Sequence, residues 1–253
     1  PEQIVIADDG SGHETTALIE QWKAFYAKEF PGTRLSHAWQ ADEGFRAAQA
    51  RNRAVSLAME VGRPDVIIFL DGDCIAPPWF IQNHLRLLSR GVMVAGGRGL
   101  LTPAFTELLE KNPCALDRDV IRASLGFFRS PYSLWQKKNC DRYLSMLPMM
   151  STWLLSVRDR RPTDDSLVRT CNLSAWRTDF ESAGGFDESF VGWGLEDTEF
   201  AVRLIDNGVR VRSGRFATNV FHLWHPERSR EQLELNIRLL QQSRDRRSVI
   251  ASQ

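Results

Sequence analysis

The chain has 253 residues, of which 43% are hydrophobic and 25% are charged, and its 32 basic and 32 acidic residues give a formal net charge of zero. This length and composition are ordinary for a soluble globular protein with a sizeable core. The balanced charge gives no broad electrostatic footprint for nucleic acid, so we expect no nucleic-acid partner.

The cysteine pattern and the hydropathy bear on the compartment. The four cysteines are widely spaced and form no Cys-x-x-Cys pair, which argues against a structural zinc site or a disulfide framework and favours a reducing compartment. No apolar stretch reaches about 18 residues, and no signal peptide is visible. We therefore expect a cytoplasmic protein without a transmembrane segment, with at most a peripheral association with the inner face of the membrane.

The first hundred residues alternate between strand and helix patterns. The apolar run over 65–70 is the strongest strand signal, and it is typical of a central parallel strand covered on both faces. The alternation predicts an α/β, Rossmann-like fold with a mostly parallel central sheet and helices on both faces. The expected strands cover 4–7, 35–39, 65–70 and 92–95, and the expected helices cover 15–28, 45–61 and 79–90.

The second part of the chain has a different texture. Residues 100–170 suggest mostly helix, and a turn is expected at 184–187. A helix over 196–207 then leads to strands over 209–211 and 218–223. The tail from 229 to 244 predicts a charged amphipathic helix.

Two acidic clusters fall at predicted strand ends. Asp71 and Asp73 are one residue apart after the 65–70 strand, where two carboxylates can share a hard cation such as Mg²⁺ or Mn²⁺. The alternative is a solvated turn. Asp8 and Asp9 follow the first strand and suit either an ordinary turn or, beside the other cluster, nucleobase and ribose contacts.

Two further motifs lie in the second half. Trp193 stands between glycines and precedes Glu196 and Asp197, an arrangement that suits stacking on a sugar ring and base catalysis on a hydroxyl. The alternative is that these two carboxylates only complement a helix dipole. His222 and His225 are candidates for a further metal ligand, or else ordinary structural histidines.

Taken together, these motifs resemble those of family 2 glycosyltransferases of the GT-A fold. The stretch at 184–197 is similar to the acceptor motif of galactosyltransferase-type and chondroitin-polymerase-type domains. The matching stretches are IVIADDGS at 4–11, GFRAAQARN at 44–52, IFLDGD at 68–73 and GGFDESFVGWGLED at 184–197.

The resemblance implies roles in donor binding. Asp8 and Asp9 would contact the uridine, and Arg51 would lie near the nucleotide. Asp71 would face the ribose or a metal-bound water, and Asp73 would bind Mn²⁺ or Mg²⁺.

It also implies the remaining metal ligand and the acceptor side. His225 would be the third metal ligand, with His222 as the fallback. Asp197 would be the catalytic base, and Glu196 would assist it. The acceptor sugar would be held by Trp193, Gly194 and Glu196.

The implied reaction is an inverting transfer of a hexose or N-acetylhexosamine from a UDP-sugar to a carbohydrate acceptor. The implied organisation is one GT-A domain, with a nucleotide-sugar-binding half over 1–99, an acceptor-binding half over 100–228 and a C-terminal helix and tail over 229–253. Family members usually begin with another strand and helix, so the chain starts at what would be the second strand.

Three rival functions stay open at this point. One is a retaining enzyme similar to polypeptide N-acetylgalactosaminyltransferases, which shares the acidic, Gly-Trp-Gly and late-histidine features. Another is a nucleotide-sugar-binding module without turnover. A nucleotidyltransferase would need a glycine-rich basic phosphate loop near the first strand, and the sequence has none there.

Overall fold

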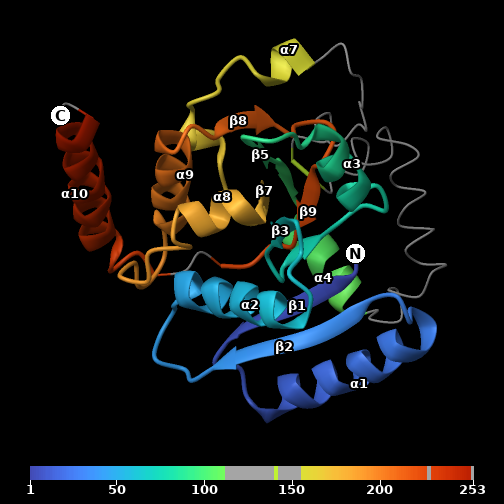
Figure 1. Ribbon diagram of the computed structural model, residues 1–253. Coiled ribbons are helices and arrows are strands. Elements are labelled where there is room, and N and C mark those ends of the chain that lie inside the picture. Colours follow the sequence, from blue (N-terminus) through green and yellow to red (C-terminus); the bar gives the residue numbers. More distant parts are fainter. Residues whose placement is uncertain (112–139, 142–154, 227–228, 252–253) are drawn as a thin grey trace. The chain divides into compact units, whose positions relative to one another are not determined.

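The computed structural model describes residues 1–111, 140–141, 155–226 and 229–251. The chain divides into two compact units, each built from segments distant in sequence (Figure 1). Unit 1 comprises residues 1–67, 176–209 and 228–253, and unit 2 comprises residues 68–175 and 210–227. Most of the helices expected over 100–170 lie outside the described residues, and the single-domain organisation stays a prediction.

Unit 1 begins with the expected strand–helix alternation. Its strands β1 and β2 pair in parallel, with Gln3 opposite Arg34 and Asp9 opposite Gln40. Figure 1 shows α1 and α2 flanking this pair on opposite sides. The elements of unit 1 are β1 (Gln3–Asp9), α1 (His13–Glu29), β2 (Arg34–Gln40), α2 (Ala47–Val61), α8 (Arg177–Ser182), α9 (Glu196–Asp206) and α10 (Leu233–Ala251).

The turn after β1 depends on a glycine. Gly10 has a φ of +93°, and a Cβ atom there would lie 2.5 Å from the Cα atom of Asp42. Only glycine combines that backbone conformation with so close a neighbouring chain. The turn ends β1 directly after its two aspartates.

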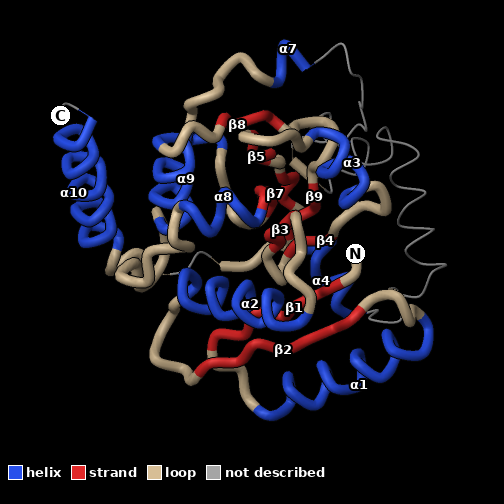
Figure 2. Tube along the Cα trace, in the orientation of Figure 1, coloured by secondary structure: helices blue, strands red, loops and turns tan. Residues whose placement is uncertain are grey.

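Unit 2 is built on two sheets, whose strands appear in red in Figure 2. The strand orders are β3-β7-β5-β8 and β4-β9-β6. The pairs β5–β8 and β6–β9 are parallel, whereas β5–β7 and β4–β9 are antiparallel. The strands are β3 (Val66–Leu70, which begins in unit 1), β4 (Cys74–Ile75), β5 (Val92–Ala95), β6 (Arg98–Leu100), β7 (Asn172–Trp176), β8 (Arg210–Ser213) and β9 (Val220–His222).

The helices that the structure describes in unit 2 are short. They are α3 (Phe80–Leu87), α4 (Pro103–Lys111), α7 (Leu155–Arg158) and the 3₁₀ turn η4 (Asp165–Leu167). Leu87 of α3 packs with Val94 of β5 and Ala217 in a buried cluster. This packing places the core of unit 2 along β5, all four of whose residues are buried.

The expectation that the 65–70 strand is central is wrong. In the described residues β3 ends the four-strand order, and Leu70 is 40% exposed. The central positions belong to β7 and β5, because β5 pairs with β7 on one side and β8 on the other. An apolar run signals burial, but it does not fix a strand's place in the sheet. The α/β class itself is confirmed, and the described strand pairs include both parallel and antiparallel ones.

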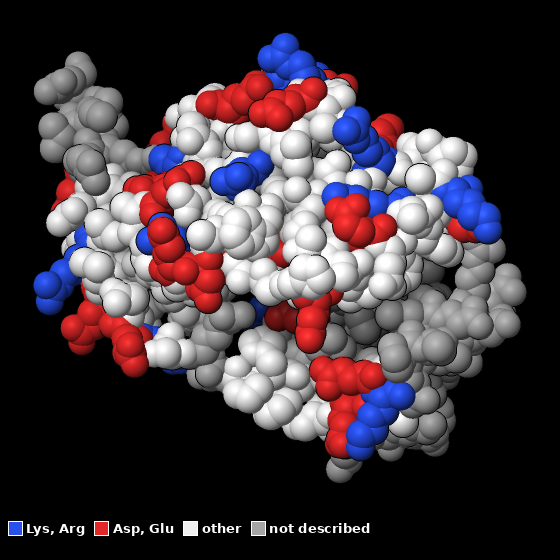
Figure 3. Space-filling model, turned by 90° about the horizontal axis from the view of Figure 1, so that it is seen from below, with Lys and Arg blue, Asp and Glu red and all other residues white. Residues whose placement is uncertain are grey.

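The surface and the helices add two observations. On the face in Figure 3, Lys and Arg side chains are interspersed with Asp and Glu, without one dominant sign. None of the described helices is long and apolar enough to cross a membrane.

Candidate functional site

A cluster of metal-ligating side chains lies in unit 2, at the start of β4. Cys74 stands opposite His222 in the antiparallel β4–β9 pair, and the backbone N–H of Leu223 donates to the carbonyl of Asp73 at 2.8 Å. This register brings the last residue of the Asp71-Gly72-Asp73 turn to the segment that carries the two histidines.

The distances suit a divalent cation. Asp73 Oδ2 lies 3.5 Å from His222 Nε2 and 3.3 Å from His225 Nε2, and the two imidazole rings have centroids 5.1 Å apart. A carboxylate with imidazoles is a donor set for Mn²⁺ and similar ions. Within the described chain, the three residues whose ligand atoms all lie within 4.8 Å of one another are Asp73, Cys74 and His222. Asp71 is not in that group.

Cys74 is the member of this group that the sequence did not nominate. Its thiol donates to Asp73 Oδ1 at 3.5 Å. A hydrogen bond with Cys171 and burial raise the pKa of the Cys74 thiol far above its usual value, and the nearby Asp73 and Asp71 act in the same direction. The thiol is therefore protonated at neutral pH when no cation is near.

In unit 1, the predicted uridine-binding carboxylates already have internal partners. Asp8 is buried, and it accepts from the Ser11 backbone N–H and pairs with His37 Nε2, both at 2.8 Å. Burial tends to raise the pKa of Asp8, but the Ser11 and His37 hydrogen bonds outweigh it, so the pKa lies below its usual value. Asp9 accepts from Gln40 Nε2 and from the Arg46 backbone N–H, each at 2.6 Å.

Arg51 and Glu196 form an ion pair across 145 positions of sequence. Arg51 NH1 lies 2.9 Å from Glu196 Oε1, and the two side chains are only 14% and 11% exposed. Arg51 also lies 5.7 Å from the centre of the Phe186 ring. Burial and the neighbouring Asp197 raise the pKa of Glu196, while Arg51 opposes that shift. The pair joins α2 to the first turn of α9.

The loop before α9 has an unusual backbone. Gly192, Gly194 and Leu195 have φ values of +76°, +102° and +77°. A positive φ costs little at the two glycines, whereas at Leu195 it strains the backbone. The loop presents Trp193, which is 41% exposed, and leads into α9, where Asp197 is half-buried and accepts from the Thr198 backbone N–H at 2.7 Å.

The C-terminal segment holds this loop. Asn236 of α10 is fully buried and donates to the carbonyls of Val191 and Gly194, at 3.1 and 2.9 Å. The Arg230 guanidinium lies 5.2 Å from the centre of the Trp193 ring. No sequence pattern indicated this attachment, because it depends on where α10 packs in the folded chain.

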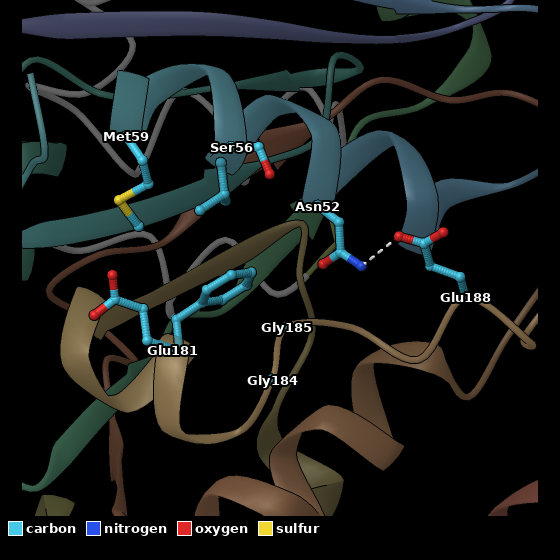
Figure 4. A pocket seen from close by; sticks show the side chains of 9 residues that line it. Asn52, Ser56, Met59, Glu181, Gly184, Gly185 and Glu188 are labelled. Atoms are coloured by element: carbon cyan, nitrogen blue, oxygen red, sulfur yellow. Dashed lines mark hydrogen bonds between the residues drawn. The ribbon is translucent and has the colours of Figure 1, made fainter. Parts of the chain in front are cut away.

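A hollow of about 370 Å³ lies elsewhere in unit 1 (Figure 4). The dashed line in the figure marks the 2.8 Å bond from Asn52 Nδ2 to Glu188. Asn52 also exchanges two hydrogen bonds with the backbone of Phe186 and so fixes the 184–188 turn on α2. None of the residues nominated from the sequence lines it. The lining residues are Asn52, Val55, Ser56, Met59, Phe180, Glu181, Gly184, Gly185 and Glu188.

The nominated residues thus fall into two groups. Unit 2 brings together Asp73, His222 and His225, and unit 1 brings together Arg51 and Glu196. Asp71 also belongs to unit 2. The other nominated residues belong to unit 1, and they are Asp8, Asp9, Trp193, Gly194 and Asp197.

The fold is that of GT-A glycosyltransferases. One similar solved structure is GalNAc-T7 with UDP, GalNAc and Mn²⁺, which matches with a TM-score of 0.55 at 16% identity over 89% of this chain and 38% of that one. Another is a mannosyltransferase from Pyrobaculum calidifontis in complex with GDP-Man and Mn²⁺, with a TM-score of 0.53 at 14% identity over 93% of this chain and 52% of that one.

The chain belongs to glycosyl transferase family 2, whose sequence pattern matches residues 1–138, while the pattern called N-terminal domain of galactosyltransferase matches 160–226. Validoxylamine A glucosyltransferase of Streptomyces hygroscopicus subsp. jinggangensis (strain 5008) is 27% identical, over 84% of this chain and 46% of its own length. Chondroitin synthase of Escherichia coli is 23% identical, over 95% of this chain and 34% of its own length. The chain therefore spans less than half the length of these relatives. The family and fold expected from the sequence motifs are confirmed.

Proposed function

We propose that the chain is the catalytic part of a metal-dependent, inverting glycosyltransferase that moves a hexose or N-acetylhexosamine from a UDP-sugar to a carbohydrate acceptor. The observation that carries the proposal is the approach of His222 and His225 to Asp73, in a chain of glycosyl transferase family 2. The names of the relatives, a glucosyltransferase and a chondroitin synthase, support sugar transfer. The nucleotides and Mn²⁺ in the similar solved structures support the donor class.

The metal-binding role falls to unit 2. Asp73, His222 and His225 would hold Mn²⁺ or Mg²⁺, because the Asp73 carboxylate lies 3.5 Å from the His222 imidazole and 3.3 Å from the His225 imidazole. The bound cation would neutralise the charge that develops on the departing diphosphate. We assign Asp71 to the ribose or to a water near the cation.

The acceptor role falls to unit 1. Trp193 offers an exposed ring face for a sugar, next to Gly194, and Glu196 is held in place by Arg51. Asp197 would take the proton of the acceptor hydroxyl while the hydroxyl oxygen attacks the anomeric carbon. The bond to the diphosphate breaks in the same step, so that the configuration inverts.

The nucleoside role is shared by strand-end groups of unit 1. Asp8 and Asp9 stand at the end of β1, where ligands of open α/β sheets bind. Because Asp8 is buried and its two carboxylate oxygens already have partners in Ser11 and His37, we expect it to support the turn, and the half-buried Asp9 to make the direct contact with a uridine. Arg51 would lie near the nucleotide and would contribute indirectly, through its ion pair with Glu196.

Substitution of Asp73 tests the metal assignment. Asp73→Asn should lower the Mn²⁺-dependent affinity for UDP at least about 100-fold, because a carboxylate ligand becomes a neutral amide. Isothermal titration with and without Mn²⁺ measures this, with the exposed Asp65→Asn variant as the matched control. Unchanged affinity in Asp73→Asn would remove the assignment.

Substitution of Asp197 tests the base. Asp197→Asn should leave UDP binding intact and slow transfer about 10²–10⁴-fold, the range typical of a positioned general base. Transfer that persists at the normal rate would place the base elsewhere. The anomeric configuration of the product separates the inverting reaction from the retaining alternative: a retained configuration would rule out the single displacement proposed here.

A further inference from the structure

The sulfur atom of Cys74 lies in the same donor group as Asp73 and His222. The three ligand atoms are all within 4.8 Å of one another. Two of these contacts are 3.5 Å, from Cys74 Sγ to Asp73 Oδ1 and from Asp73 Oδ2 to His222 Nε2. His225 approaches the same carboxylate at 3.3 Å.

These spacings fit tetrahedral coordination. Zinc holds nitrogen and oxygen ligands at about 2.0–2.2 Å and sulfur at about 2.3 Å, so neighbouring ligand atoms of a tetrahedron lie about 3.3–3.8 Å apart. The 3.3 and 3.5 Å contacts fall in that range. Cys74 contacts Oδ1 of Asp73 and the imidazoles contact Oδ2, so a closed site requires side-chain rotations that bring these donors around one ion.

The backbone holds these donors independently of any cation. Cys74 and His222 are cross-strand partners in the β4–β9 ladder, and the Leu223 N–H···O=C Asp73 bond ties the next residues together. A site built on paired strands is preorganised, and ligands need little ordering on binding.

The ligand chemistry separates two classes of cation. Mn²⁺ and Mg²⁺ favour oxygen donors, whereas a thiolate favours Zn²⁺ and Cd²⁺. We propose that Cys74, with Asp73 and His222, forms a binding site for a thiophilic divalent cation of the zinc class, at the place where the proposed function puts Mn²⁺ or Mg²⁺. The inference rests on that metal site. It makes zinc-class ions competitors of the catalytic cation, and therefore inhibitors of transfer.

The binding step involves no oxidation or reduction. The S–H bond of Cys74 breaks, a metal–sulfur bond forms, and the proton leaves to the solvent. Two described thiols offer contrasts. Cys171 is a neighbour of Cys74, whereas Cys140 is buried in a different cluster, with Leu101 and Phe221, and its thiol donates to the Asp141 carbonyl.

Zinc-edge X-ray absorption of the reduced chain with one equivalent of Zn²⁺ tests the proposal directly. We expect one sulfur neighbour at about 2.3 Å beside nitrogen and oxygen neighbours at about 2.0–2.2 Å. The sulfur neighbour should vanish in Cys74→Ser and persist in Cys140→Ser. A wild-type spectrum with nitrogen and oxygen alone, or a sulfur neighbour that survives in Cys74→Ser, would overturn the proposal.

Metal affinities distinguish this inference from the proposed function. Cys74→Ser should lower the preference for Zn²⁺ over Mn²⁺ at least about tenfold, and Cys140→Ser should not change it. If Cys74→Ser does not fold, judged by circular dichroism, the wild-type spectrum still decides whether sulfur is bound. Zinc–sulfur coordination without Mn²⁺-dependent UDP binding would keep this inference and end the proposed function. The reverse result would end the inference alone.

Discussion

His84 of α3 illustrates how burial governs a single residue. It is fully buried, with Nδ1 2.8 Å from Ser174 Oγ and Nε2 2.9 Å from Asn172 Oδ1. Burial lowers the pKa of His84 to about 4, although the hydrogen bond with Asn172 acts in the opposite direction. The imidazole therefore stays neutral in the folded chain and serves packing, since a substrate has no access to a fully buried ring.

This burial predicts a pH dependence of stability. Between pH 6.5 and 4 the unfolded chain binds a proton at His84 that the folded chain does not, so stability falls as the pH drops through this window. The loss should approach about 3 kcal/mol. Urea unfolding at pH 7.5, 6 and 5 gives the unfolding free energy of wild type and of His84→Gln, and this free energy should fall more steeply with decreasing pH in wild type. The exposed His13→Gln variant is the control, and equal slopes in wild type and His84→Gln would contradict the prediction.

The ion pair of Arg51 and Glu196 gives a second residue-scale prediction. Arg51→Met should destabilise the chain by about 2–4 kcal/mol, because it leaves the carboxylate of a largely buried Glu196 without its cation. Adding Glu196→Gln to that variant should recover part of the loss, since the uncompensated charge disappears. Chemical denaturation of both variants checks this. A double variant no more stable than Arg51→Met would show that packing, not charge, dominates.

The sequence patterns pointed to three side chains that lie close together in the structure, and their metal-binding role stays a prediction. Carboxylates at a strand end and late histidines predicted Asp73 with His222 and His225, and these side chains do lie together. Cys74 was missed because its role depends on facing His222 across β4–β9. Such a register between segments nearly 150 positions apart leaves no local pattern.

At the scale of elements, periodicity predicted segments with a clear local apolar pattern and missed strands without one. The expected strand 92–95 coincides with β5, and the expected helix 15–28 lies within α1 (His13–Glu29). The strands β4, β6 and β7 were not predicted. They have two, three and five residues, and their hydrogen bonds come from distant partners rather than from their own propensity.

The attachment of α10 carries the prediction at this scale. Asn236→Ala should free the carbonyls of Val191 and Gly194 and destabilise α10 and the 191–195 loop by about 1–3 kcal/mol. Hydrogen exchange should accelerate in these two segments while β5 keeps its protection. Asn207→Ala is the matched control, because its amide makes one exposed 3.3 Å bond to the Ser182 carbonyl. Faster exchange throughout the chain would instead indicate global destabilisation.

For the whole molecule, the decisive quantity is stabilisation by the donor. The formal net charge is zero, so the chain has no net charge that would attract an anionic nucleotide in general. A rise in melting temperature therefore reports a specific site. A ligand at 100 times its dissociation constant adds about 2.7 kcal/mol to the free energy of unfolding, which raises the melting temperature by roughly 5–10 °C for a chain of this size.

We expect that rise in melting temperature from UDP-sugars with Mn²⁺, and smaller rises from GDP- and dTDP-sugars or without Mn²⁺. The Mn²⁺-dependent part should disappear in Asp73→Asn, because removing one ligand of the Asp73, His222 and His225 cluster removes the link between cation and diphosphate. Equal shifts in wild type and Asp73→Asn would mean that the nucleotide binds without this cluster.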